Sequence, residues 1–377
     1  MRILLISTSY PPVLGGLETV VYNIACGLKK KGHVVRVATN SYQYKISGQC
    51  IEDGIYVSRL YQLTPDIIYN LKQGRLNRVL LSILFFPVAL FRLVKLIITF
   101  RPEVIGVRQP RAYTFCLRWL KKRYNFRLVV SLHSDDVLTL DSQGTISPIL
   151  RHLFRQADSV TACSYWLLRQ ACTLYPVIID KGRVIYNGID QGRFLDTRAY
   201  PHPRPYVFAF GRLAHVKGFD LLIQAFAKVA DDFPELDLII AGEGECRRLL
   251  EDVAESCSVS NRVVFFGRAN PNEVVHLLNG CEFVVVSSRY EPFGIVALEA
   301  MAAKKSVIVT RVGGLPEFVE TEGNRFVDPT VSGLADGMRD FLESGYGSLS
   351  KVDITRFSWE CIVAEYEKIL RGAEELK

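Results

Sequence analysis

Residues 281–299 read CEFVVVSSRYEPFGIVALE, which is the order of a strand, a loop and a helix. The first eight residues are mostly apolar, rich in β-branched side chains and bounded by small ones, so they predict a buried strand. Pro292 and Gly294 then break the strand, and the residues that follow have a helix-forming composition. Glu291 is therefore expected on the loop at the carboxyl end of a strand, and Glu299 about one turn inside the next helix.

The position of these two glutamates predicts a kind of ligand. Open α/β sheets bind ligands in the crevice at the carboxyl ends of their strands, where backbone N–H groups and the helix dipole attract phosphate. Two carboxylates beside a phosphate site would repel the phosphates unless they bound hydroxyl groups. The combination suggests a nucleotide that carries a polyol. The alternative is a solvated glutamate pair that flanks the start of a helix.

The stretch resembles the E-x7-E signature of retaining glycosyltransferases of the GT-B group, in glycosyltransferase family 4 (group 1), which includes bacterial wall, capsule and lipopolysaccharide enzymes. The resemblance implies an α/β protein with the GT-B fold, in which two Rossmann-like doubly wound domains face each other across a cleft. It also implies a hexosyltransferase that moves a sugar from a nucleotide diphosphate to an acceptor hydroxyl with retention. The leaving diphosphate would accept the proton of the acceptor.

The domain organisation follows from length and pattern. The 377 residues fit two domains of about 180 residues each. A segment rich in turn residues and prolines at 187–205 predicts a linker. We expect an acceptor-binding domain over 1–190 and a nucleotide-sugar-binding domain over 204–356. The family resemblance implies that the tail, 357–377, forms a helix that packs back on the first domain.

Apolar strands alternate with helical patterns in both halves, which predicts βαβ units and parallel sheets. The strands predicted in the first half are 2–7, 34–39, 104–107, 128–133, 160–162 and 184–186. Those predicted in the second half are 206–210, 236–241, 263–266, 283–286 and 306–310. Helices are predicted over 16–31, 221–230 and 246–256.

A second motif, GRLAHVKG at 211–218, follows the first predicted strand of the second half. Arg212 and Lys217 can converge there on one pyrophosphate, the arginine as a bidentate fork and the lysine as a point charge near a helix N-terminus. Both charges also suit the leaving-group side of glycosyl transfer. A cationic surface turn is the alternative. The string matches the same family, and the match implies catalytic roles for Arg212, Lys217 and Glu291.

The resemblance also assigns the donor-binding residues. It implies that Glu299 binds the ribose hydroxyls, and that Glu291 holds the donor sugar together with the backbone of Phe293 and Gly294. The remaining donor-binding positions that it implies are Gly15, Gly16, Gly242, Arg268 and Ile295. The Gly15-Gly16 pair allows backbone N–H groups to approach an anion, and it lacks the third glycine of a conventional NAD site.

His133 ends a predicted strand of the first domain. A lone histidine is often structural, but related enzymes carry a histidine here that hydrogen-bonds the transferred sugar, so the resemblance implies a catalytic role. Asp135 or Asp136 is expected to orient an acceptor hydroxyl. A rival interpretation makes one of these aspartates a covalent nucleophile.

The sequence contains no D-x-D pair. Transferases that hold the nucleotide diphosphate through Mg²⁺ or Mn²⁺ commonly need such a pair, and the charges of Arg212 and Lys217 can replace that of the metal. We therefore predict no metal site and no cofactor, with the nucleotide sugar as co-substrate. A UDP-sugar is the favoured donor.

The net charge of +7 is spread unevenly. Residues 71–127 hold thirteen Lys or Arg against one acid, Glu103, so this segment carries +12 and the remainder −5. Within it, 79–91 is uncharged but contains Pro87, and it is predicted to be too short and too interrupted to span a bilayer. A basic, apolar helix is typical of an interfacial membrane anchor, and a core helix with a solvated basic face is the alternative. We expect a lipid-linked or otherwise anionic acceptor at an anionic membrane surface, and no nucleic acid, because no binding motif accompanies the charge.

The nine cysteines form no C-x-x-C pair and no His/Cys cluster, which predicts a reducing compartment and no structural zinc. The first residues lack a signal-peptide pattern. We expect a cytoplasmic protein associated peripherally with the inner face of the membrane. Three rival functions stay open: transfer to a soluble small-molecule acceptor, a GT-B nucleotide-sugar epimerase or phosphorylase, and a non-catalytic nucleotide-sugar sensor.

Overall fold

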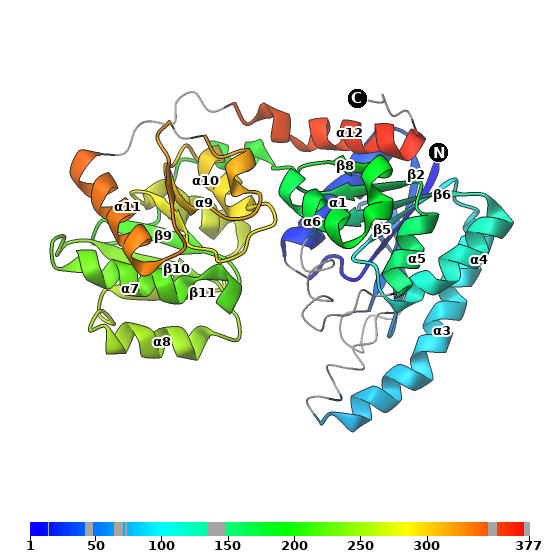
Figure 1. Cartoon of the computed structure of the whole chain (residues 1–377), viewed down its shortest axis with the longest axis horizontal. Helices are drawn as coiled ribbons and strands as arrows, with labels where there is room; N and C mark the ends of the chain where they lie inside the picture. Colours follow the sequence, from blue (N-terminus) through cyan, green and yellow to red (C-terminus); the bar gives the residue numbers. More distant parts are fainter. Residues whose placement is uncertain are drawn as a thin grey trace. The chain divides into compact units, whose positions relative to one another are not determined.

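The computed structural model describes residues 1–13, 15–41, 48–63, 71, 74–133, 148–320, 322–345 and 353–372. The chain divides into two compact units (Figure 1). Unit 1 comprises Met1–Gly188 and Trp359–Lys377, and unit 2 comprises Ile189–Ser358. The boundaries predicted after residues 190 and 356 each lie two residues from those of the units.

The sheet of unit 1 has eight strands in the order β3-β4-β2-β1-β5-β6-β7-β8. All neighbouring strands are parallel except β3 and β4, which are antiparallel. The strands are β1 (Arg2–Ser7), β2 (Val34–Asn40), β3 (Gly48–Glu52), β4 (Ile55–Leu60), β5 (Val104–Arg108), β6 (Arg127–Leu132), β7 (Ser159–Ala162) and β8 (Gly182–Val184). Because the central strands are covered on both faces, they read as continuous apolar runs.

The described helices of unit 1 are α1 (Gly16–Lys30), α3 (Leu76–Phe100), α4 (Phe115–Tyr124), α5 (Pro148–Gln156), α6 (Tyr165–Leu174) and α12 (Trp359–Arg371), with the 3-10 turns η1 (Ala112–Thr114) and η2 (Pro176–Lys181). The C-terminal helix α12 packs against α1 (Figure 1). A Cβ at Gly27 would lie 2.5 Å from Cγ2 of Val363, so the glycine permits this close approach.

The sheet of unit 2 has six parallel strands in the order β11-β10-β9-β12-β13-β14. They are β9 (Tyr206–Phe210), β10 (Asp237–Ala241), β11 (Val263–Gly267), β12 (Val284–Val286), β13 (Val307–Thr310) and β14 (Arg325–Val327). The α-helices are α7 (Phe219–Ala230), α8 (Arg247–Ser256), α9 (Pro271–Gly280), α10 (Ile295–Ala302) and α11 (Val331–Ser344). The 3-10 turns are η3 (Gln191–Leu195), η4 (His215–Lys217), η5 (Leu315–Glu317) and η6 (Thr355–Phe357).

Helix α3 corrects one sequence prediction. The segment that the sequence predicts to be short and interrupted lies inside a continuous helix of 25 residues that runs through Pro87. The proline removes one backbone donor, but the helix continues because its C-terminal part is fixed by the burial of Leu93, Ile97 and Phe100. By length and composition alone, α3 is long and apolar enough to cross a membrane.

The predicted linker is also corrected in part. From Ile189 onward the segment belongs to unit 2. The backbone N–H of Tyr200 donates to the carbonyl of His276 at 2.8 Å, and the amide of Asn279 donates to the carbonyl of Asp196 at 2.6 Å. Because α9 satisfies these backbone groups, this part of the segment is packed structure.

Candidate functional site

The site in unit 2 lies where the strand order reverses. Strand β9 pairs with β10 on one side and with β12 on the other, so the loops that follow β9 and β12 leave the carboxyl edge of the sheet in opposite directions. This is the topological switch point at which open α/β sheets bind ligands. The loop after β9 carries Arg212 and Lys217, and the loop after β12 carries Glu291.

Backbone hydrogen bonds hold the neighbouring loops together. The N–H of Gly211 donates to Ala241 at 2.9 Å, and the N–H of Gly242 donates to Gly267 at 2.7 Å. These bonds connect the ends of β9, β10 and β11 in one row. Gly242 has φ +148, and a Cβ there would overlap the carbonyl oxygen of Gly211, so the close approach requires glycine.

Lys217 and Glu291 form the central contact of the site. The Lys217 ammonium lies 2.6 Å from Oε2 of Glu291, and the hydroxyl of Ser288 donates to the same oxygen at 3.3 Å. The Glu291 side chain is 10% exposed and that of Lys217 is 26% exposed. Arg212, on the same loop as Lys217, is exposed and forms no ion pair with any carboxylate in the described ranges. Two cations are therefore available to an anionic ligand: Lys217, which Glu291 partly neutralises, and Arg212, which no described carboxylate neutralises.

Three residues that sequence reasoning missed, Asp220, Ser287 and Arg289, fix these loops to each other. Arg289 forms a bidentate ion pair with Asp220, at 2.6 and 2.7 Å, and it also donates to the carbonyl of His215 at 3.0 Å. The hydroxyl of Ser287 donates to the carbonyl of Lys217 at 3.0 Å. A signal was present in the sequence, since Asp220 directly precedes the helix predicted over 221–230 and Arg289 stands two residues before Glu291.

Glu299 lies in the second turn of α10 and has little solvent contact, with 18% of its side chain exposed. Its nearest cation in the described structure is Arg193, whose Nη1 lies 4.0 Å from Oε1. Burial raises the pKa of Glu299 to about 7, although Arg193 acts in the opposite direction. A carboxylate that is costly to bury can gain from ligand hydroxyl groups that donate hydrogen bonds to it.

Glu299 should make the stability of the protein depend on pH. Its pKa in the folded protein, about 7, lies above the ordinary value of 4.5, so the folded state retains a proton that the unfolded state releases. The free energy of unfolding should therefore fall as pH rises through this window, by up to about 3 kcal/mol. Urea unfolding at pH about 5 and at pH about 8 measures the difference in the free energy of unfolding. Glu299→Gln should abolish this difference, whereas Glu245→Gln, at an exposed position, should preserve it. Equal pH slopes in wild type and Glu299→Gln would contradict the assignment.

In unit 1, Gly15 and Gly16 lie at the start of α1, where both are exposed. The carboxylate of Glu18 folds back over Gly15 so closely that a Cβ there would overlap it, and the hydroxyl of Ser9 donates to Glu18 at 2.5 Å. The N-terminus of α1 is therefore covered by an acidic side chain of its own first turn. A donor phosphate at this loop would have to displace that carboxylate.

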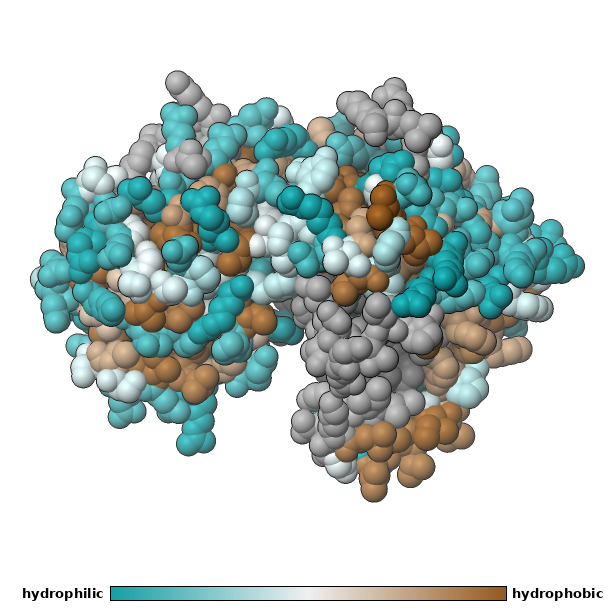
Figure 2. All heavy atoms as spheres, viewed as in Figure 1, coloured by the Kyte–Doolittle hydropathy of each residue, from teal (hydrophilic) through white to brown (hydrophobic). Residues whose placement is uncertain are grey.

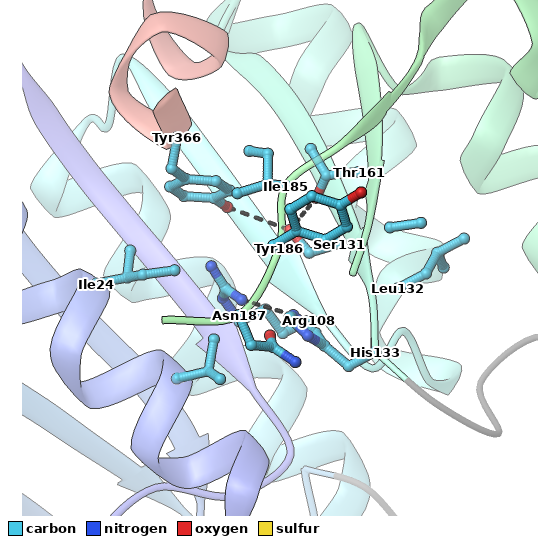
Figure 3. Close-up of a pocket in the computed structure, with 12 residues that line it drawn as sticks. Ile24, Arg108, Ser131, Leu132, His133, Thr161, Ile185, Tyr186, Asn187 and Tyr366 are labelled. Carbon is cyan, nitrogen blue, oxygen red and sulfur yellow. Dashed lines mark hydrogen bonds between the residues drawn. The ribbon is translucent and has the colours of Figure 1, made fainter. Parts of the chain in front are cut away.

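His133 is held by a residue that the sequence did not single out. Nη1 of the fully buried Arg108 donates to Nε2 of His133 at 2.6 Å (Figure 3). The side chain of Asn187 is also hydrogen-bonded to the ring, while burial and the charge of Arg108 hold the pKa of His133 well below its usual range. The imidazole is therefore neutral, and its proton lies on Nδ1 because Nε2 accepts.

The remaining predicted residues have simple placements. Phe293 is buried and stacks on Phe318 with 4.7 Å between ring centroids, so its backbone alone is available to a ligand. Gly294 precedes α10 with φ +107, Ile295 begins that helix, and Arg268 is exposed after β11. Asp135 and Asp136 lie outside the described residues.

Within the described ranges, no group of three His, Cys, Asp or Glu is placed to hold a metal ion. The predicted residues that come into contact, in the switch-point loops of unit 2, are Lys217 and Glu291, and Arg212 lies on the same loop as Lys217. His133, Gly15 and Gly16 belong to unit 1.

Comparisons with known proteins match nearly the whole chain. Residues 14–193 match the model of Glycosyltransferase Family 4, and residues 194–353 match that of Glycosyl transferases group 1. An uncharacterized glycosyltransferase of Methanocaldococcus jannaschii is 27% identical over 100% of this chain and 99% of that protein. The N-acetyl-alpha-D-glucosaminyl L-malate synthase of Bacillus anthracis is 24% identical over 96% of this chain and 95% of that protein.

Solved structures share the fold. Sucrose-phosphate synthase from Thermosynechococcus elongatus superposes with a TM-score of 0.79 at 21% identity, covering 99% of each chain. The Anabaena protein HepE, solved with UDP and glucose, gives a TM-score of 0.73 at 21% identity over 98% of this chain and 99% of that one. The predicted fold class, two parallel-sheet domains of GT-B type, is confirmed. The chain therefore belongs to glycosyltransferase family 4, the GT-B enzymes also described as glycosyl transferases group 1.

Proposed function

We propose that the protein is a retaining, metal-independent hexosyltransferase that uses a nucleotide diphosphate sugar, with UDP as the favoured nucleotide. The observation that carries this proposal is the contact of Lys217 with Glu291 at the switch point of unit 2, with Arg212 on the same loop. The two cations can bind the diphosphate of such a donor, and the carboxylate can bind the hydroxyl groups of its sugar. The UDP and UDP-glucose complexes of the Anabaena protein HepE support the choice of nucleotide.

The cations act on the leaving group. In a front-face transfer, the bond from the anomeric carbon to the diphosphate breaks while the acceptor oxygen bonds to the same face of that carbon. The acceptor proton passes to the departing diphosphate oxygen. Arg212 and Lys217 stabilise the negative charge that develops there, which is the role that a metal ion has in other transferases.

The carboxylates act on the hydroxyl groups. Glu291, released from Lys217 as the diphosphate binds, accepts hydrogen bonds from the sugar, and Glu299 accepts them from the ribose. In unit 1, His133 is a neutral ring, since Arg108 fixes its tautomer. Its Nδ1–H is the group that can donate to a sugar oxygen, in exchange for Asn187.

We further propose that the acceptor is lipid-linked or otherwise anionic, and that transfer takes place at the inner face of a membrane. The basic segment 71–127, with its charge of +12, supports this class of acceptor. The nine cysteines, all free thiols, are compatible with a reducing cytoplasm. A soluble small-molecule acceptor is the alternative.

A thermal-shift screen of nucleotide sugars tests the donor. The true donor should stabilise the protein by about 2.7 kcal/mol at 100-fold excess over its Kd, because it binds the folded state alone. The same donor should then be turned over in excess chelator at an undiminished rate. If no nucleotide sugar stabilises the protein, or if chelated enzyme recovers activity only with Mg²⁺, the proposal fails. Conversion of the donor sugar without any acceptor would instead indicate an epimerase.

A further inference from the structure

An exposed apolar surface in unit 1 has no role in the donor site. Six apolar residues of α3 are between 44% and 68% exposed, namely Leu76, Leu80, Ile83, Leu84, Val88 and Phe91. Their spacing places them along one side of the helix. Figure 2 shows apolar side chains gathered where Figure 1 draws the N-terminal half of α3. On α4, which packs against α3, Phe115 and Trp119 are 74% and 64% exposed one turn apart.

Basic side chains accompany these apolar residues on the same two helices and at their ends. The exposed cations of the two helices and their flanks are Arg75, Arg78, Arg92, Lys95, Arg101, Arg111, Arg118, Lys122 and Arg123. Between residues 71 and 127 the sequence holds one acid, Glu103, which lies beyond the end of α3. We call these apolar and basic residues of α3 and α4 the α3–α4 face.

We propose that the α3–α4 face docks on an anionic lipid bilayer, with α3 lying in the interface and its exposed apolar side chains inserted among the headgroups. Burying exposed apolar side chains away from water lowers the free energy, and the basic residues of the face are attracted to anionic headgroups. Trp119 and the long stems of the lysines and arginines suit this boundary, because each combines an apolar body with a polar end.

A helix that is long and apolar enough could also cross the bilayer, but the packing of α3 excludes this arrangement. The opposite side of α3 is buried in unit 1 through Ala89, Leu93 and Ile97, and the helix contacts β4 and α4. A crossing would have to remove these residues from their core and carry Arg92 and Lys95 into hydrocarbon. An interfacial position leaves the fold unchanged.

Charge also decides against a second copy of this chain as the occupant. A symmetric dimer would place the α3–α4 face of one copy against that of the other, and so bring the basic residues of both copies together. Like charges at such an interface repel each other, whereas an anionic bilayer neutralises them. The inference rests on the proposed function in one respect: docking on a membrane would give the enzyme access to a lipid-linked or anionic acceptor.

Vesicle sedimentation of the whole protein tests the docking. Phosphatidylcholine vesicles with and without about 30 mol % phosphatidylglycerol are compared at low and high salt. Wild type should sediment with the anionic vesicles, at least about tenfold more strongly than with neutral ones at low salt, and the preference should shrink as salt rises. Failure to sediment with anionic vesicles at low salt overturns the proposal.

Two variants separate the apolar and charged contributions. The apolar variant, Leu80→Ser with Leu84→Ser and Phe91→Ser, should lower the vesicle partition coefficient by about tenfold or more. The basic variant, Arg118→Gln with Lys122→Gln, should remove most of the preference for anionic lipid. If the apolar variant binds vesicles as wild type does, α3 is not the docking element.

The matched control combines Ile51→Ser, Ile179→Ser and Leu249→Ser, three exposed aliphatic residues elsewhere. It should bind vesicles like wild type, and equal loss in control and apolar variant would contradict a defined surface. Light scattering without vesicles identifies a dimer, and a dimer that the apolar variant dissociates would assign the face to a second copy and overturn the proposal. The donor-induced thermal shift should persist in every variant, so that failure of docking and failure of the proposed function are read separately.

Discussion

Replacing Lys217 with alanine should lower kcat/KM for glycosyl transfer by about 10²- to 10³-fold, which is the usual cost of removing one group that stabilises a developing negative charge. Nζ of Lys217 lies 2.6 Å from Glu291 in the free protein. Its charge is therefore already positioned at the switch point before the donor binds. Initial rates with the donor found in the thermal-shift screen measure the effect.

The control is Lys304→Ala, which removes an exposed lysine from the same unit and should leave the rate unchanged. Urea unfolding should report a folded Lys217→Ala protein, with stability lowered by about 1 to 2 kcal/mol, because Glu291 loses its cation but keeps Ser288. A rate within about threefold of wild type would remove Lys217 from the catalytic machinery.

The effects of substituting Glu291 and Lys217 on the rate of transfer should not be independent. Glu291→Ala is expected to lower kcat/KM to a similar extent as Lys217→Ala, and the double variant should be little worse than either single one. Groups that act as one unit give such non-additive losses, whereas independent contacts give free energies that add. Additive losses would separate the two residues into unrelated roles.

The sequence was sufficient to place the switch-point loops of unit 2 because its signals there are local. In residues 281–299 a strand, two breaking residues and a helix follow each other without a gap, and the structure has β12, the loop and α10 in that order. The GRLAHVKG string is local in the same sense. The paired strands then bring the two loops to one edge, as the rule for parallel sheets requires.

Most of the missed features depend on tertiary contacts. Arg59 is 1% exposed in β4 and is paired with Glu52 at 2.6 Å, so a charged residue interrupts the apolar pattern of that strand. Arg108 likewise resembles a surface cation in sequence, yet it is buried over the ring of Tyr366. The passage of α3 through Pro87 is also decided by packing, since its C-terminal part is buried in unit 1. The pairing of β3 with β4 is different, because it is a local hairpin in which Glu52 pairs with Ile55 across the Asp53-Gly54 turn. That turn signal was present in the sequence and was missed.

Gly242→Ala should be the most destabilising single substitution among the predicted donor-binding glycines. Its φ of +148 is strained for any residue with a Cβ, and the added atom would overlap the carbonyl of Gly211 in the loop that carries Arg212. The two loops must separate, which breaks the bonds from Gly211 to Ala241 and from Gly242 to Gly267. We expect the free energy of unfolding to fall by about 3 to 5 kcal/mol, with loss of the donor-induced thermal shift.

Gly267→Ala provides the comparison that isolates the overlap from the backbone strain. Gly267 also has a positive φ, of +81, but a Cβ there would meet nothing within 4 Å. Its substitution should cost about 1 to 2 kcal/mol, the strain of a left-handed residue alone, and should preserve donor binding. Urea unfolding of both variants gives the two costs directly. If the two variants lose the same free energy of unfolding, the overlap with Gly211 adds nothing to the backbone strain. The close approach of the loops after β9 and β10 would then not be what holds the cations in place.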